Sequence, residues 1–215
     1  MTVTKNSILL KLLITFFMTL TLITGCVSND DNDNPSPPGN GIQTPDDTSE
    51  EQPSQSDDSK KILLDTIMNL AKEGKVINIS FTLKTNVIED VEKEWGEPET
   101  SDWIPEAKGT YSTYPSKGIG FGWNKGSQLF EIRSFDSEIK KIPLSEVKNI
   151  FGTPDYDVKV NGEEIIGYVV NEEFKILLVF PEPTTSSPDP LMDHYSVFYP
   201  RGTVNQMAND PGREW

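Results

Sequence analysis

The sequence is poor in the residues that build disulfide frameworks and metal sites. It contains one cysteine, Cys26, and one histidine, His194, among its 215 residues. A single thiol excludes an intramolecular disulfide, so an exported domain must rely on its core alone. A single imidazole without a second thiol also excludes the usual zinc ligand sets, and we expect neither a metal nor another cofactor.

Basic residues are scarce as well. The chain has 19 Lys and Arg against 34 Asp and Glu, which gives a formal net charge of −15. A phosphate backbone is bound by clustered lysines and arginines that displace its counterions. The charge balance therefore speaks against nucleic acid as a partner.

One long apolar run, Leu12–Ile23, follows Lys5 and Lys11 near the start of the chain. It is shorter than the roughly 20 helical residues that a bilayer requires, and it is typical of the apolar region of a signal peptide. We therefore predict that residues 1–25 are a signal peptide.

The run ends in "ITGC", which resembles the bacterial lipobox, where a small residue precedes an obligatory cysteine. This resemblance implies that Cys26 receives a diacylglyceryl group and becomes the mature N-terminus. Two acyl chains hold a protein firmly to a membrane, whereas one chain binds only marginally. We expect a lipoprotein on the extracytoplasmic face of the cell membrane; the alternative is an incidental cysteine beside an uncleaved anchor.

Residues 26–60 are predicted to form a disordered linker after the lipidated cysteine. The segment consists largely of Asp, Asn, Ser, Pro, Gly and Glu, so it offers little surface to bury. Its "DDNDN" cluster does not fit an EF-hand, because Pro35 falls where that loop requires glycine.

An internal repeat organises the remaining residues, 61–215. "NVIEDVEKEWGEP" (86–98) and "IPLSEVKNIFGTP" (142–154) share their apolar positions and a final Gly-x-Pro. Each copy predicts a short amphipathic helix that ends at the glycine. We expect Asn86 to cap the first helix, with Glu89 completing the capping box, and Pro143 to lie in the first turn of the second.

Strand signals follow both predicted helices, and a longer helix precedes them. Apolar spacing predicts a helix over 60–74 that ends at Gly74, followed by an extended segment over 77–83. The predicted strands are Thr110–Tyr114, Ile119–Trp123, Gln128–Ser134, Tyr156–Val160, Glu164–Val170, Phe174–Phe180 and Tyr195–Tyr199. Asn161-Gly162 is a strong type I′ hairpin signal.

These elements predict an α+β domain of tandem helix plus antiparallel-strand repeats, over about 86–136 and 142–200. The short helices are expected to pack on one face of an antiparallel sheet. The other face is expected to be at least partly open, and we expect function there.

Several blocks carry a family resemblance: "VIEDVEKEWGEP", "AKGTYSTY", "FGWNKGSQLFEIRSFD", "VNGEEIIGYVV", "DHYSVFYPRGTVN" and "NDPGREW". In this order they resemble the YjgB family of lipoproteins from Gram-positive bacilli, which is defined by a domain of unknown function. The resemblance covers residues 61–215 and implies a secreted lipoprotein, with no catalytic or binding residues to transfer. The tandem repeat also resembles β-lactamase inhibitor proteins and small outer-membrane-assembly lipoproteins, in architecture alone.

Catalytic signals are weak. His194 lies beside Asp193 and near Ser196, but residues in sequence on a strand point to opposite faces, and no G-x-S-x-G motif occurs. The many acidic residues leave a carboxylate pair for glycoside hydrolysis open without singling one out. Glu131 and Arg133 share a strand face, which is typical of a solvated charge cluster.

The candidate binding residues are aromatic or arginine, the types favoured at binding surfaces. Tyr111 and Tyr114 differ in strand parity, so at least one is expected on the sheet surface. Trp103 lies in a predicted loop, and Arg133 lies on a predicted strand. We predict these four as contacts to a wall glycan or partner, with packing as the alternative.

The leading functional hypothesis is a non-enzymatic, membrane-anchored binding module whose partner is an envelope protein. The alternatives are a carboxylate-dependent cell-wall hydrolase and a structural envelope component without a discrete site. The sequence does not indicate an oligomeric state.

Overall fold

The computed structural model describes residues 55–204, which form an α+β fold with one eight-stranded antiparallel sheet. The predicted signal peptide, Cys26 and residues 26–54 of the predicted linker lie outside the described residues. The first helix begins at Gln55, before the predicted domain start at Lys61. No helix within the described range is both long and apolar enough to cross a membrane.

The helices are α1 (Gln55–Lys72), α2 (Ile88–Trp95) and α3 (Leu144–Phe151). The strands are β1 (Thr100–Ile104), β2 (Gly109–Tyr114), β3 (Ile119–Trp123), β4 (Leu129–Ser134), β5 (Tyr156–Val160), β6 (Glu163–Val169), β7 (Lys175–Pro181) and β8 (His194–Phe198). Short 3₁₀ turns are η1 (Pro115–Lys117), η2 (Ile139–Lys141) and η3 (Pro200–Gly202). Both repeat helices and all seven predicted strands are confirmed within a few residues.

The strand order is β1-β2-β3-β4-β8-β7-β6-β5. Each half of the sheet is therefore a four-stranded meander that follows one short helix. The sequence predicts four strands for the second half but three for the first, because β1, which contains Trp103, lies where a loop was predicted. The two halves join where β4 pairs antiparallel with β8, for example Arg133 opposite Ser196. The last strand of one half thus continues the sheet of the other.

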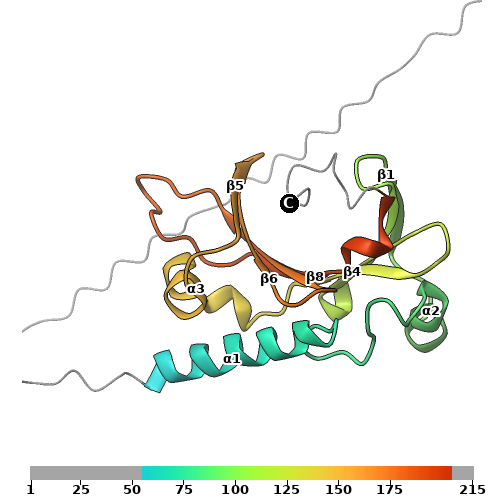
Figure 1. Ribbon diagram of the computed structural model, residues 1–215, viewed down its shortest axis with the longest axis horizontal. Coiled ribbons are helices and arrows are strands. Elements are labelled where there is room, and N and C mark those ends of the chain that lie inside the picture. Colours follow the sequence, from blue (N-terminus) through green and yellow to red (C-terminus); the bar gives the residue numbers. More distant parts are fainter. Residues whose placement is uncertain (1–54, 205–215) are drawn as a thin grey trace, which may run out of the picture. The chain divides into compact units, whose positions relative to one another are not determined.

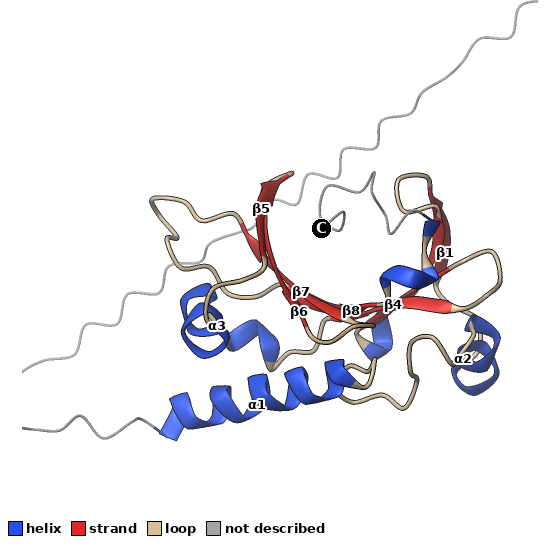
Figure 2. Ribbon diagram, viewed as in Figure 1, coloured by secondary structure: helices blue, strands red, loops and turns tan. Residues whose placement is uncertain are grey.

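All three α-helices lie on the convex side of the curved sheet (Figures 1 and 2). Their apolar stripes bury the main core against strands from both halves, with Leu64, Val91 and Val147 completely or almost completely buried. Short amphipathic helices gain their stability from such tertiary packing, since eight residues alone are too few for a stable helix in water.

The concave face of the sheet, which we expected to be at least partly open, carries buried apolar side chains. A second buried cluster lies there: Ala107, Tyr111, Phe130, Ile165, Leu177, Val179 and Phe198. Both sheet faces therefore contribute to the hydrophobic core, because the β4–β8 junction brings side chains of the two meanders together.

Three local predictions are wrong. The segment 77–83 is irregular and joins no strand, with Asn78 at φ 63°. The first repeat helix is capped one residue later than expected, because the backbone N–H of Val87 donates to the carboxylate of Asp90 at 3.1 Å. Asn86 instead accepts from the N–H of Thr82, and Pro143 precedes the first helical residue.

The predicted hairpin turn is confirmed. Asn161 and Gly162 both have positive φ, at 54° and 83°, between the paired strands β5 and β6. A type I′ turn requires positive φ at both central positions, and Asn-Gly adopts it with little strain.

Candidate functional site

The strongest candidate site is a pocket of about 640 Å³ at one end of the sheet. Its lining comes from three connections and one strand: Trp103, Lys108, Asn124, Lys125, Gly126, Gly202, Thr203 and Val204. We call it the Trp103 pocket. Its volume lies within the roughly 300–1,000 Å³ that is typical of small-molecule sites.

The strand register explains why these residues meet. Ile104 pairs with Gly109 at the β1–β2 turn, and Thr110 pairs with Trp123 just before the β3–β4 turn. Both turns therefore leave the sheet at the same end, and η3 follows β8 there. In an antiparallel meander, every second turn lies at the same end of the sheet.

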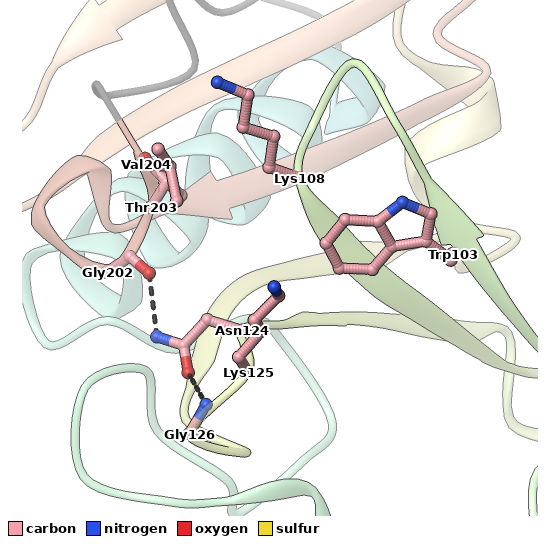
Figure 3. A pocket seen from close by; sticks show the side chains of 8 residues that line it. All are labelled: Trp103, Lys108, Asn124, Lys125, Gly126, Gly202, Thr203 and Val204. Carbon is pink, nitrogen blue, oxygen red and sulfur yellow. Dashed lines mark hydrogen bonds between the residues drawn. The ribbon is translucent and has the colours of Figure 1, made fainter.

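The aromatic wall of the pocket is Trp103, whose side chain is 47% exposed. In Figure 3 it faces Thr203 and Val204 across the pocket, with Lys108 above and Asn124 and Lys125 below. The Nζ of Lys125 lies 5.9 Å from the centroid of the Trp103 ring, within cation–π range.

A hydrogen-bonded asparagine fixes the opposite wall. The side-chain amide of Asn124 donates to the carbonyl oxygen of Gly202 at 2.8 Å, and its Oδ1 accepts from the N–H of Gly126 at 2.9 Å (Figure 3). Asn124 thereby ties the β3–β4 turn to η3, so two segments distant in sequence are held in one geometry.

Two of the sequence-predicted residues meet on the concave face, away from this pocket. The Tyr111 hydroxyl donates to Glu131 at 2.5 Å, and Nε of Arg133 donates to the same carboxylate at 2.9 Å. The Arg133 guanidinium lies 4.4 Å from the Tyr111 ring centroid. The predicted shared face of Glu131 and Arg133 is confirmed, but the carboxylate is completely buried and not solvated.

The other two predicted residues are separated from that cluster. Asp102 pairs with Tyr111, so the neighbouring Trp103 leaves the opposite face of the β1–β2 hairpin. Tyr114 is 5% exposed and packs in the helix-covered core, where burial raises the pKa of its hydroxyl. Its side chain is used for packing, so we do not include it in the candidate site.

His194 shows no catalytic arrangement. Its Nδ1 lies 2.8 Å from the carboxylate of Asp193, and its ring stacks on Phe135 with centroids 4.8 Å apart. Burial lowers the pKa of the imidazole, which opposes the raising effect of Asp193. Within residues 55–204, no serine hydroxyl is hydrogen-bonded to this ring, and no cluster of metal-ligating side chains occurs.

The sequence analysis missed the lysines of the pocket, although a signal was present. Lys108 and Lys125 both precede glycine, in "AKG" and "NKG". These turns flank predicted neighbouring strands, so the predicted meander already placed them at one end of the sheet. The contribution of η3 had no such signal. Its residue Gly202 lies 76 residues after Gly126, the pocket residue of the β3–β4 turn.

Comparisons with known proteins agree with the resemblance noted in the sequence. The model of the DUF4309 family, described as a domain of unknown function, matches residues 64–198. The crystal structure of a DUF4309 family protein, YjgB from Bacillus subtilis subsp. subtilis str. 168, is similar with a TM-score of 0.48 and 18% identity. The similarity covers 65% of this chain and 97% of that chain.

A search of curated proteins found no match. The resemblance to β-lactamase inhibitor proteins stays a prediction about architecture. Because the family model spans more than half of the sequence, the chain belongs to the DUF4309 family, whose function is unknown.

Proposed function

We propose that this chain is a non-enzymatic, lipid-anchored binding module of the cell envelope, and that it contacts an envelope component through the Trp103 pocket. The observation that carries the proposal is a half-exposed tryptophan in a pocket whose wall is fixed by hydrogen bonds. Large aromatic side chains are commonly buried in folded domains, and exposed ones are favoured at binding sites.

The proposed ligand binds in a pocket, whereas the sequence analysis expected a protein partner. Of the four predicted contact residues, Tyr111 and Tyr114 are 9% and 5% exposed. Arg133 is engaged with Glu131. Trp103 is thus the predicted residue with the most accessible side chain, and it lines a concave site of small-molecule size.

The pocket also favours binding over hydrolysis. None of its described lining residues is an aspartate or a glutamate. A glycosidase of the usual kind requires two carboxyl groups beside the scissile bond. A carboxylate-dependent hydrolase would therefore need a different site on this chain.

Retention on the full-length protein tests the proposal. The detergent-solubilised chain is immobilised and exposed to envelope extract and to purified wall fragments, and bound material is identified by mass spectrometry. Trp103→Ala is expected to abolish retention. Val169→Ala is the matched control, since Val169 is a 52% exposed apolar residue that is absent from the pocket. Equal retention by both variants would overturn the proposed site.

The anchor has its own test. Cys26→Ser removes the thiol that would carry the lipid, so the protein is expected to leave the membrane fraction and to accumulate unprocessed. If the variant stays quantitatively in the membrane fraction in processed form, the lipid anchor is wrong.

A further inference from the structure

The polar side chains of the Trp103 pocket differ in what they can offer a ligand. Both polar atoms of the Asn124 side chain are engaged within the wall. Its Nδ2 donates to the carbonyl oxygen of Gly202, and its Oδ1 accepts from the N–H groups of Gly126 and Gln128. The Thr203 hydroxyl donates to a backbone carbonyl at 2.7 Å. The neutral polar groups of Asn124 and Thr203 thus hold the wall together. The side-chain donors left for a ligand are the indole N–H of Trp103 and two ammonium groups.

These ammonium groups belong to Lys108 and Lys125. Neither lysine forms an ion pair with a carboxylate of the described residues, in a chain whose net charge is −15. Two lysines, with no acidic residue among the described lining residues, make the pocket locally positive. A concave site of one charge sign, with low-dielectric walls, concentrates ligands of the opposite sign.

The indole of Trp103 adds a second requirement. An anion alone, such as inorganic phosphate, would satisfy the lysines and leave the aromatic surface in water. A sugar ring presents a face of C–H groups that packs on an indole, while its hydroxyl groups stay solvated. Burying aromatic surface in this way is a substantial favourable term in binding.

We infer that the Trp103 pocket binds a saccharide that carries a carboxylate or phosphate group, with its ring on Trp103 and its anion beside Lys108 and Lys125. This inference rests on the binding function proposed above and names the class of its ligand. The same chemistry occurs in acidic wall polymers and in free sugar acids or sugar phosphates.

Calorimetric titration of the full-length protein in detergent tests the ligand class. The ligands are glucuronic acid, glucose 6-phosphate and fragments of a phosphate-bearing wall polymer, with glucose and inorganic phosphate as controls. The acidic sugars are expected to bind at least about tenfold more tightly than either control, because hydrogen bonds to a charged group are stronger than neutral ones. Their affinity is expected to fall as salt is added.

Substitutions locate the binding. Lys125→Gln is expected to weaken binding of glucuronic acid about tenfold, and Trp103→Ala is expected to abolish it. Lys117→Gln is the matched control, because the Nζ of Lys117 lies 5.6 Å from the centroid of the Trp95 ring, outside the pocket. Circular dichroism of each variant verifies that it is folded.

Several results would overturn the inference. Glucose that binds as tightly as glucuronic acid would show that the lysines take no part. Phosphate that binds as tightly as glucose 6-phosphate would make this an anion site without a saccharide. If wall material is retained in a Trp103-dependent manner but no acidic sugar binds, the inference fails and the proposed function survives. If neither occurs, both fail.

The source of the saccharide follows from the relative affinities. Tighter binding of the wall-polymer fragments supports the inference with a polymer as the ligand. Tighter binding of the single sugars supports it with a soluble metabolite as the ligand.

Discussion

The phenol of Tyr168 donates a hydrogen bond to the carbonyl oxygen of Gly152 over 3.0 Å. The other half of the sheet repeats this contact, since Tyr114 donates to the carbonyl oxygen of Gly96 over 3.1 Å. In both halves the tyrosine lies on the second strand and the glycine ends the short helix. The repeat therefore preserves a bond that fixes the helix end to the sheet.

Removing either hydroxyl should destabilise the fold by a similar amount. Tyr168→Phe and Tyr114→Phe are each expected to lower the free energy of unfolding by about 1 kcal/mol, because each removes a partly buried hydrogen bond between the hydroxyl and the glycine carbonyl. The double variant should show the sum, since the sites lie in different halves. Urea unfolding measures all three. Tyr199→Phe is the control, because its hydroxyl makes no hydrogen bond within the described residues, and an equal loss there would contradict the assignment.

Burial also raises the pKa of Tyr168 to about 12. An unfolded tyrosine ionises near pH 10, so the folded pKa is the higher one. The stabilising contribution is then fully present below about pH 10 and is lost as the pH rises through the folded pKa. The difference in tyrosinate absorbance between the wild type and Tyr168→Phe should titrate well above pH 10. A midpoint at the ordinary value would show that this phenol is solvated.

Two glycines on β3 should respond differently to alanine. A Cβ at Gly122 would lie 2.8 Å from the Phe130 ring and 2.9 Å from the Tyr111 ring, whereas at Gly120 the nearest atom is 3.8 Å away. Gly122→Ala is expected to destabilise the protein by about 1–3 kcal/mol through overpacking. Gly120→Ala, on the same strand and face, should be nearly neutral. Urea unfolding that ranks the two variants the other way would refute the packing described.

The buried carboxylate of Glu131 should be needed for stability. Glu131→Ala leaves Arg133 and the Tyr111 hydroxyl without their shared acceptor and is expected to cost about 3 kcal/mol. This lies at the low end for a broken buried pair, because the Arg133 side chain is 25% exposed. Glu131→Gln keeps one acceptor oxygen and should lose less. Equal losses in thermal unfolding would mean that side-chain volume, and not hydrogen bonding, matters at this position.

The single histidine gives an unambiguous titration. Because burial lowers the pKa of His194, its ring proton resonance should titrate below the ordinary value of about 6.5. A folded pKa below the unfolded one means that this contribution to stability is present above about pH 6.5. It is lost as the pH falls through the folded pKa. Proton NMR gives the midpoint directly, and a value above 6.5 would show that Asp193 outweighs burial.

The sequence predicts the elements of the repeat well because their signals are local. Helical apolar spacing, the Gly-x-Pro endings and the Asn-Gly turn each depend on neighbouring residues. The edge strand β1 was missed because four of its five residues are exposed, so it lacks alternation. The repeat itself contained the information, since subtracting its 56-residue offset from β5 gives residues 100–104.

The extended segment predicted over residues 77–83 is wrong for the opposite reason, because it shows alternation but pairs with no strand. Residues 77–83 alternate in hydrophobicity because Ile77, Phe81 and Leu83 anchor an irregular connection to the core. Alternation reports which side chains are buried, and it predicts a strand only when backbone partners are available. The N–H of Ile77 is satisfied by the Tyr195 hydroxyl at 2.9 Å instead of a neighbouring strand.

The candidate site was predictable only in part. Strand parity placed Glu131 and Arg133 on one face, and antiparallel pairing brought Tyr111 beside them. The Trp103 pocket depends on Asn124 reaching Gly202, a contact across 78 residues that leaves no periodic trace in the sequence.

The junction of β4 with β8 places a subunit-like interface inside one polypeptide. Each meander ends in a strand whose outer backbone groups are satisfied only by the other meander. Either half produced alone would expose that edge, and an exposed edge recruits another strand. Because the two meanders are covalently linked, each edge strand meets its partner strand at a high effective concentration. A solitary half would have to pair with another copy of itself.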